Sequence, residues 1–197
     1  MADLAKVAEN LKERGYAVTV CKNKEEAAAY LNGAIDGVSV AFGGSRTLDQ
    51  LGLYDLLKTH NDVIWHWKDG VEVLPSAMQT EVYVSSVNAM AETGESVNID
   101  GNGNRVASTL YGHKKVYLVV GTNKLTENLD AAIWRARNVA GPIRAQQQNR
   151  KTPCALKADR CYDCKSPDRI CRGMVVLMGP MMSAATEVIL VNEELGC

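Results

Sequence analysis

The sequence predicts an α/β fold in which a mostly parallel sheet is flanked by helices, as a single domain over residues 1–197. Amphipathic helical segments alternate with short apolar segments from the N-terminus onward, and this order builds a parallel sheet covered by helices. The chain has 197 residues, of which 46% are hydrophobic, so it is long enough to bury one sizeable core.

Helical spacing and end signals predict the helices. Apolar residues recur every three to four positions from Leu4 to Leu11, and Gly15 follows as a stop, so residues 1–15 are expected to form a helix. Asn23 and Glu26 resemble a capping box that opens a second helix, which ends near Gly33. Further helices are expected at residues 48–58, 104–111 and 126–140, the last of them stopped by Gly141 and Pro142.

Short apolar segments between these helices predict the strands. They are bounded by turn residues and are too short to be buried helices. Residues 68–81 fit neither pattern. The expected strands lie at residues 16–21, 37–42, 63–67, 82–86, 96–99, 116–120, 175–178 and 187–191.

Charge and composition exclude several classes of partner. The 22 Lys and Arg residues balance 23 Asp and Glu, which argues against a nucleic acid or a membrane surface as the partner. The first residues lack the pattern of a secretory signal, and no apolar segment approaches the roughly 20 residues of a spanning helix. A cytoplasmic protein is therefore expected. In a reducing compartment, close-spaced cysteines are more often ligands or redox groups than disulfides.

A glycine-rich loop follows the strand expected at residues 37–42. The segment AFGGSRTLDQLGL places Gly43 and Gly44 directly before Ser45 and Thr47, which open a helix. Glycines let backbone N–H groups approach a ligand, and a helix N-terminus favours an anion such as phosphate or carboxylate. The alternative is a tight turn whose Ser45 or Thr47 caps the helix. The pattern matches neither the P-loop nor the dinucleotide-binding fingerprint.

Polar residues also gather in SVNAMAETGESVNIDGNGNRV, residues 86–106. Loops at the ends of parallel strands collect ligand-binding groups in α/β folds. Glu92 is the candidate catalytic carboxylate, whereas Asp100 and Arg105 either fix a charged ligand or pair with each other across a turn. The expected ligand-binding residues are Gly43, Gly44, Ser45, Thr47, Asn88, Thr93, Asp100, Asn104, Arg105, Asn123 and Lys124.

Four of the six cysteines lie in a basic segment at about residues 144–172. It holds eight Lys or Arg against three Asp and lacks apolar periodicity, so it is expected to leave the core as an excursion inserted before the last strands. A two-residue gap lets two thiolates bind one metal, and two flanking cysteines complete a four-sulfur shell. Redox-active cysteines, disulfides or unliganded thiols are the alternatives. The expected ligands of a zinc ion or an iron–sulfur cluster (4Fe-4S) are Cys154, Cys161, Cys164 and Cys171.

The other chemically suggestive residues are expected to be structural. His60, His66 and His113 have no partner at ligand spacing, so surface or packing roles are expected. Cys21 ends a strand and is expected to be buried as a small apolar group, and Cys197 is expected to be free. Core or interface positions are likewise expected for the tryptophans Trp65, Trp67 and Trp134.

Three segments together resemble the LUD domain, which is found in lactate utilization protein C and its relatives. They are GGSRTLDQLGL from residue 43, SVNAMAETGESVNIDGNGNRVASTLYG at 86–112 and KKVYLVVGTNKLTENLDAAIWRARNVAGP at 114–142. The resemblance continues through TPCALKADRCYDCKSPDRIC to EVILVNEELG and so covers most of the chain. Lactate utilization protein C lacks the four-cysteine segment, which a stand-alone branch of the family has.

The resemblance implies a fold similar to the ribose-5-phosphate isomerase and coenzyme A transferase superfamily. In that superfamily the glycine-rich loop, here Gly43 to Thr47, contacts substrate, and some coenzyme A transferases use a loop glutamate comparable to Glu92 as the nucleophile. The implied function is a component of L-lactate oxidation to pyruvate, alongside iron–sulfur oxidoreductase subunits.

Three hypotheses follow from these observations. The first is an accessory or catalytic component of lactate (2-hydroxy acid) utilization with a metal at the cysteines and a small anionic metabolite in the loops. The alternative is a stand-alone enzyme on a phosphorylated or coenzyme A-linked metabolite, using the glycine-rich loop and Glu92. The third is a purely structural partner protein. Association into a homo-oligomer is left open.

Overall fold

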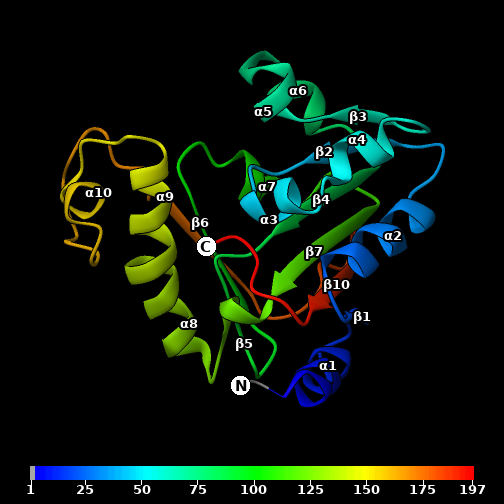
Figure 1. Ribbon diagram of the computed structural model, residues 1–197, viewed down its shortest axis with the longest axis horizontal. Helices are drawn as coiled ribbons and strands as arrows, with labels where there is room; N and C mark the ends of the chain where they lie inside the picture. The colour runs from blue at the N-terminus through cyan, green and yellow to red at the C-terminus, as the bar shows by residue number, and fades with distance from the viewer. Residues whose placement is uncertain (1–2) are drawn as a thin grey trace.

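A six-stranded sheet runs through the centre of the computed structural model, which describes residues 3–197 (Figure 1). Its strand order is β1-β10-β7-β4-β2-β3, and every neighbouring pair is parallel. The predicted mostly parallel sheet is therefore confirmed. The strands are β1 Ala17–Cys21, β2 Ser39–Phe42, β3 Asp62–Ile64, β4 Val82–Ser86, β7 Lys115–Gly121 and β10 Ala185–Val191.

A second, four-stranded sheet has the order β8-β5-β6-β9. β6 is antiparallel to both β5 and β9, and β8 is parallel to β5. The sequence predicts β6 and β9 as strands but misses β5 and β8. Both are very short and lack a period-two apolar pattern, so pairing with neighbouring strands decides their conformation. The strands are β5 Ala89–Ala91, β6 Ser96–Asp100, β8 Leu125–Thr126 and β9 Gly173–Leu177.

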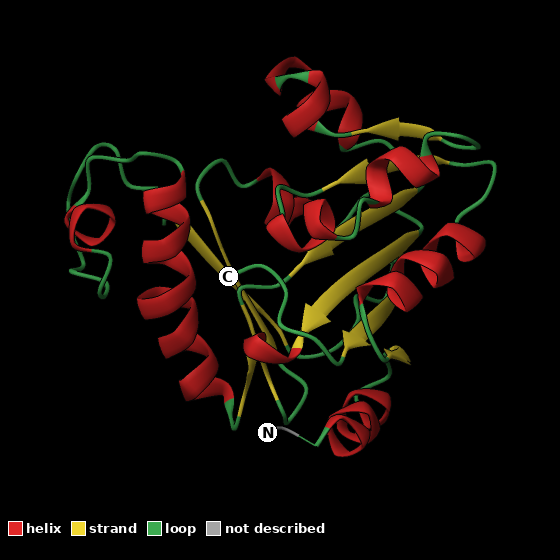
Figure 2. Cartoon of the chain, in the orientation of Figure 1, coloured by secondary structure: helices red, strands yellow, loops and turns green. Residues whose placement is uncertain are grey.

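Helices flank the large sheet (Figure 2). As predicted, the Asn23 side chain caps the second helix by accepting the Glu26 N–H at 2.9 Å. Within residues 3–197, no helix is both long and apolar enough to cross a membrane. The α-helices are α1 Leu4–Glu13, α2 Lys24–Ala34, α3 Arg46–Gln50, α4 Leu53–Leu57, α5 His66–Asp69, α6 Leu74–Ala77, α7 Asn104–Leu110, α8 Leu129–Arg135, α9 Gly141–Gln147 and α10 Pro153–Lys157.

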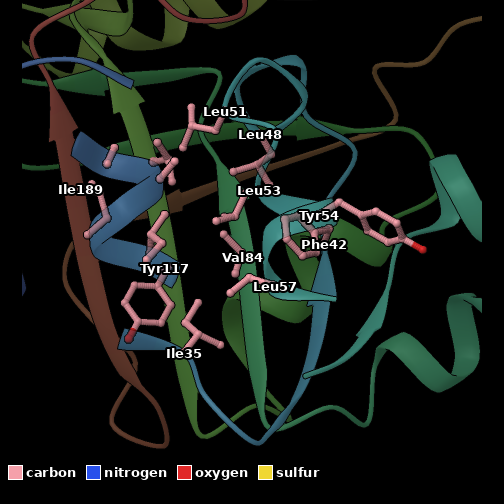
Figure 3. Packing of buried hydrophobic residues seen from close by; sticks show 14 of the residues in the cluster. Ile35, Phe42, Leu48, Leu51, Leu53, Tyr54, Leu57, Val84, Tyr117 and Ile189 are labelled. Carbon is pink, nitrogen blue, oxygen red and sulfur yellow. The ribbon is translucent and has the colours of Figure 1, made fainter. Parts of the chain in front are cut away.

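Side chains of the large sheet alternate between two apolar cores. In β7, Tyr117 and Val119 point into one core, and Leu118 and Val120 point into the other. The first core lies under α2, α3 and α4, around Phe42 (Figure 3). The second lies against α1 and the small sheet. The central strands are therefore covered on both faces, which explains their nearly continuous apolar sequences.

Two predicted elements are shorter than expected. The helix predicted at 48–58 is divided into α3 and α4, because Gly52 adopts a left-handed conformation with φ of 61°. The strand predicted at 63–67 stops at Ile64. There the Asp69 carboxylate accepts the Trp65 N–H at 2.7 Å and α5 begins, which converts the end of the apolar segment into a helical turn.

The helix predicted at 126–140 does not stop at Gly141 and Pro142. It begins at Leu129 and continues through a π-helical turn, Ala136–Ala140, into α9 (Figure 1). Proline lacks an N–H and crowds the carbonyl group four residues earlier. The π-turn inserts an extra residue, so that the Gly141 N–H reaches the Ala136 carbonyl and Pro142 opens the next segment.

The excursion predicted at about 144–172 begins later than expected. Its first residues form α9, in which Ala145 is only 1% exposed and therefore belongs to the packed interior. The chain then leaves the core, forms α10 and returns as β9 and β10. In the structure this segment precedes β9 and β10, and it starts after Gln147 rather than at about residue 144.

Candidate functional site

The loops that end four parallel strands meet at one edge of the large sheet. Parallel strands direct their carboxyl ends the same way, so polar residues that follow them come together. Ser45 follows β2, Asn88 follows β4, Lys124 follows β7 and Cys197 follows β10. All four line a cavity of about 190 Å³, which α9 and the cysteine segment close on the other side. Figure 1 shows the C-terminus between α9 and the large sheet.

This cavity, called the basic cleft below, carries a strong excess of positive charge. Among the described residues, five cationic side chains and one carboxylate line it. The sequence predicts seven of its lining residues as ligand-binding: Gly44, Ser45, Asn88, Asp100, Asn104, Arg105 and Lys124. The lining residues that the sequence analysis missed include Arg46, Trp67, Ser86, Arg144 and Arg150.

Lys124 lies at the bottom of the basic cleft and is only 3% exposed. Its Nζ donates to Thr47 Oγ1 at 2.7 Å and to Ser86 Oγ at 2.8 Å. Burial lowers the pKa of Lys124 to about 7, against a partial opposing effect of negative charge at Cys197. A buried ammonium group held by two neutral hydroxyls is typical of a site that an anionic ligand completes.

Asp100 and Arg105 act mainly in holding the cleft wall together. The Asp100 carboxylate accepts the backbone N–H groups of Gly101 at 2.7 Å and Arg105 at 3.0 Å. The Arg105 guanidinium donates to the Asn88 side chain at 3.0 Å and to the Ile99 carbonyl at 2.7 Å. Most of the donors of Arg105 are therefore occupied within the protein, which favours positioning over direct ligand binding for this residue.

Trp67 forms a side of the basic cleft and carries two cationic neighbours. The guanidinium carbon of Arg144 lies 4.6 Å from a ring centroid of Trp67, and that of Arg46 lies 5.8 Å away. Cation–π contact holds such guanidinium groups in place while leaving N–H donors free for an anion. The sequence predicts a core or interface position for Trp67 and places Arg144 in the excursion. Neither residue carries a local signal for this site.

Gly43 and Gly44 are required by close packing. A Cβ at Gly43 would lie 2.6 Å from Ser85 Oγ, and one at Gly44 would lie 2.9 Å from Trp67 Nε1 and 3.3 Å from His66 Nε2. His66 thus packs against the glycine-rich loop. Ser45 caps α3 through its Oγ, which accepts the N–H of Leu48 at 3.4 Å. Gly44 and Ser45 also line the basic cleft. The same segment is therefore both a helix-capping turn and part of the candidate ligand loop.

Gly43→Ala is expected to destabilise the fold by about 1–3 kcal/mol, because the added methyl group overpacks the region below the cleft. Gly33→Ala is the matched control. A Cβ at Gly33 meets nothing within 4 Å, so this helical substitution should be neutral or stabilising by up to about 1 kcal/mol. Urea unfolding measures both changes, and equal effects would contradict the packing argument.

Five predicted catalytic or ligand-binding residues lie outside the lining of the basic cleft: Gly43, Thr47, Glu92, Thr93 and Asn123. Glu92 and Thr93 are in the turn between β5 and β6, where the Asn10 side chain donates to the Glu92 carbonyl at 2.6 Å. Asn123 instead tethers the C-terminal segment, accepting the Leu195 N–H at 3.1 Å. The structure thus separates Glu92 from the glycine-rich loop, while a catalytic role for Glu92 stays an untested prediction.

The C-terminal segment closes over Lys124. A Cβ at Gly196 would lie 2.5 Å from Thr47 Oγ1 and 3.2 Å from Lys124 Nζ, so only glycine fits there. The Gly196 N–H donates to Gln50 Oε1 at 2.7 Å, and Cys197 lines the cleft. Tertiary packing of this segment therefore contributes to the burial of Lys124.

The four predicted ligand cysteines face a second cavity, also of about 190 Å³, called the cysteine cavity below. Each is half-buried. Within residues 3–197, no three Cys, His, Asp or Glu side chains lie close enough together to hold one metal ion. The other residues that line this cavity include Ala136, Pro142, Thr152, Arg169 and Ile170.

Hydrogen bonds orient three of the four sulfur atoms. The Asp163 N–H donates to Cys161 Sγ at 3.4 Å, and Arg169 Nη2 donates to Cys171 Sγ at 3.3 Å. The Thr152 hydroxyl lies 3.2 Å from Cys154 Sγ. Hydrogen-bond donors of this kind orient metal-ligating sulfur atoms, so the chemistry of these residues fits a four-sulfur centre.

The histidines and Cys21 lie where the sequence predicts. His113 is buried and stacks on Tyr83 with ring centroids 4.9 Å apart, and the two ring nitrogens of His60 bind Asp36 and Asn32 at 3.0 Å. Cys21 is 2% exposed, and burial raises its pKa to about 11. These groups line neither cavity.

The fold and its edge of loops define an α/β protein with a basic cleft beside a cysteine-lined cavity. Comparison with protein families adds the identity of the domain: the LUD domain model matches residues 4–191, and the chain belongs to the LUD domain family. The comparison with curated proteins gives no match.

A solved structure with a TM-score above 0.5 supports the same fold. A DUF162 family protein from Deinococcus radiodurans is 13% identical, with a TM-score of 0.56 and coverage of 95% of each chain. A 5-methylthioribose 1-phosphate isomerase from Pyrococcus horikoshii is 11% identical over 92% of this chain and 53% of that one, with a TM-score of 0.32.

Proposed function

We propose that the basic cleft binds a small anionic metabolite of the 2-hydroxy acid class and that this LUD domain serves lactate utilization. The observation that supports the anion most directly is Lys124, an ammonium group buried beside two hydroxyls rather than a carboxylate. A ligand carboxylate placed near Lys124 would compensate the positive charge that the fold itself compensates only in part. Family membership is the support for lactate as the substrate class.

The remaining groups of the cleft suit the two functional groups of such a ligand. Arg144 and Arg46 offer guanidinium donors beside Trp67, and planar guanidinium groups bind carboxylates through paired hydrogen bonds. Ser86 and Asn88 offer uncharged partners for a hydroxyl or carbonyl oxygen. The chain's own groups would thus bind the acid, orient it and hold a proton at Lys124 Nζ.

Anion affinity should depend on pH through Lys124. Because the pKa of Lys124 is lowered to about 7, its positive charge is fully present below that pH and is lost as the pH rises. We expect the dissociation constants of L-lactate and sulfate to increase by up to tenfold per pH unit above pH 7, since only charged Lys124 attracts them. Neither probe titrates between pH 6 and 9, so the change reports the protein.

Isothermal titration calorimetry between pH 6 and 9 measures this dependence. Lys114→Gln is the control, because Lys114 is an exposed residue that pairs with Glu81 at the opposite end of the parallel strands. The control should keep the affinity and the pH profile of the unchanged protein. A flat profile with measurable binding would contradict the role of Lys124, and absence of binding would contradict the anion site.

A phosphorylated or coenzyme A-linked metabolite is the second candidate. The glycine-rich loop favours it, because Gly44 and Ser45 bring backbone and hydroxyl groups to the cleft. Glu92, the base or nucleophile of that hypothesis, lies outside the cleft lining. Competition between L-lactate and inorganic phosphate in the same titration decides which class binds more tightly.

We further propose that the cysteine cavity holds an iron–sulfur cluster, with zinc as the alternative. Thiolates around one zinc ion lie in a tight tetrahedron with Zn–S distances of about 2.3 Å, whereas those around a cluster are farther apart. Four cysteines that line one cavity support a four-thiolate centre. Cys154, Cys161, Cys164 and Cys171 would be its ligands.

A cluster at this position would supply one-electron transfer, and a zinc ion would supply structural support. Partner subunits of the iron–sulfur oxidoreductase type would then be the electron acceptors in lactate oxidation. Metal and sulfide analysis of anaerobically purified protein tests the centre, and co-purification with such subunits tests the partner.

A further inference from the structure

We infer that Cys171 is shared by the two cavities, so that an anion bound in the basic cleft contacts the same sulfur that serves as a ligand in the cysteine cavity. The inference rests on the proposed function, because it assumes that the cleft binds an anion. It adds that the anion and the metal centre occupy adjoining compartments of one bipartite site. An anion bound in the basic cleft would then limit the access of solvent and reagents to the metal ligand Cys171.

The two cavities have a common wall. Ile99, Gly141, Ile170 and Cys171 line both of them, whereas Cys161 faces only the cysteine cavity and Cys197 faces only the basic cleft. Of the four shared residues, Cys171 alone carries a side chain that can bind a metal. A ligand in the cleft therefore lies within reach of one particular cysteine of the set.

The wall is fixed to the end of β6. The Arg172 N–H donates to the Asp100 carbonyl at 2.9 Å, and β9 continues the pairing from Gly173 opposite Asp100. Close approach requires Gly101, where a Cβ would lie 3.1 Å from the Ile170 carbonyl oxygen. The residues on either side of Cys171 are thereby held against the same strand end that supplies Asp100 to the cleft.

The continuous helical segment made of α8, the π-helical turn and α9 forms the other part of the wall between the two cavities. Ala140 and Arg144 face the basic cleft, Ala136 and Ala145 face the cysteine cavity, and Gly141 lies between these two faces. Because Gly141 has no side chain, the separation between the cavities is thin at this point. The π-helical turn sets this register, and π-turns are frequent at functional sites.

Arg169 holds the Cys171 sulfur in place. Its Nη2 donates to Cys171 Sγ at 3.3 Å, and its Nε donates to the Cys171 carbonyl at 3.0 Å. A third bond, from Nη1 to the Cys164 carbonyl at 2.9 Å, links the same guanidinium to the neighbouring cysteine. Cys171 is thus oriented by the cysteine segment, and the same residue is among those that line the basic cleft.

Cysteine alkylation mapped by mass spectrometry tests the inference. The full chain is treated with iodoacetamide after removal of bound metal, with and without saturating sulfate or L-lactate. All the cysteines compared are half-buried, and the rate of each without the anion is its own reference. We expect the anion to slow modification of Cys171 and Cys197 at least threefold and to leave Cys161 and Cys154 unchanged. Arg144→Gln should abolish this protection, and Lys114→Gln should preserve it.

Cys197 distinguishes failure of the inference from failure of the proposed function. Protection of Cys197 without protection of Cys171 would overturn the shared sulfur and leave the anion site standing. Protection of neither cysteine would overturn both, and equal protection of all the cysteines would show a general stabilisation that contradicts the shared sulfur. In metal-loaded protein, the anion should also change the visible spectrum of the centre, and an unchanged spectrum at saturation would count against the inference.

Discussion

Replacing Lys124 by methionine is expected to stabilise the protein by about 1–4 kcal/mol and to weaken L-lactate and sulfate binding at least tenfold. The stabilisation follows because a buried ammonium group is exchanged for an apolar side chain of similar length. The loss of affinity follows because the charge that attracts the anion disappears. Opposite changes in stability and binding are characteristic of a functional residue that the fold accommodates at a cost.

The stabilisation should depend on pH, with a sign fixed by the pKa. Folding lowers the pKa of Lys124 from its ordinary value of 10.5 to about 7, so the unfolded chain binds the extra proton between these values. The penalty in the folded state is full below pH 7 and is relieved as the pH rises towards 10.5. The gain in free energy of unfolding for Lys124→Met should therefore be largest at pH 6 to 7 and smallest near pH 10.

Lys115→Met is the matched control for this substitution. Lys115 Nζ pairs at 2.8 Å with Glu187, which is 6% exposed, so its removal leaves a buried carboxylate without its cation. We expect a destabilisation of about 2–4 kcal/mol and no change in anion affinity. Urea denaturation and calorimetry measure both quantities. If Lys124→Met were to destabilise the fold like Lys115→Met and keep the affinity, Lys124 would be a structural residue.

The double substitution Cys161→Ser, Cys164→Ser is expected to remove the metal centre entirely. Losing two of four thiolates leaves too few ligands for a cluster or a tetrahedral zinc ion. Iron, zinc and acid-labile sulfide are measured after anaerobic purification, together with the visible spectrum. A brown protein whose double variant is colourless would support the iron–sulfur cluster. Stoichiometric zinc would support the structural alternative.

Loss of the centre should also loosen the cysteine segment without unfolding the sheet. Lys157, Arg160 and Lys165 are exposed there, so limited trypsin digestion should cleave the variant in this segment and spare the large sheet. Cys21→Ala is the control, because Cys21 is a buried thiol outside both cavities. It should keep the full metal content and the resistance to trypsin. If the chain without substitutions contained no metal after anaerobic purification, the proposed centre would be contradicted.

The amino-acid sequence by itself determined the elements with strong local signals. The apolar spacing of the first helix, the cap at Asn23 and the apolar central strands each act over a few neighbouring residues, so the pattern specifies them without knowledge of distant parts. The four-cysteine set and the glycine-rich loop were likewise visible, since their chemistry depends on close spacing along the chain.

Only the tertiary structure decided which of these pieces form a site. Trp67 and Arg144 come from distant segments and meet through cation–π contact, and the burial of Lys124 depends on the C-terminal segment that closes over it. The helix that passes Pro142 and the strands β5 and β8 also depend on packing against other elements. Their energies come from contacts between residues far apart in the chain, and no local pattern records such contacts.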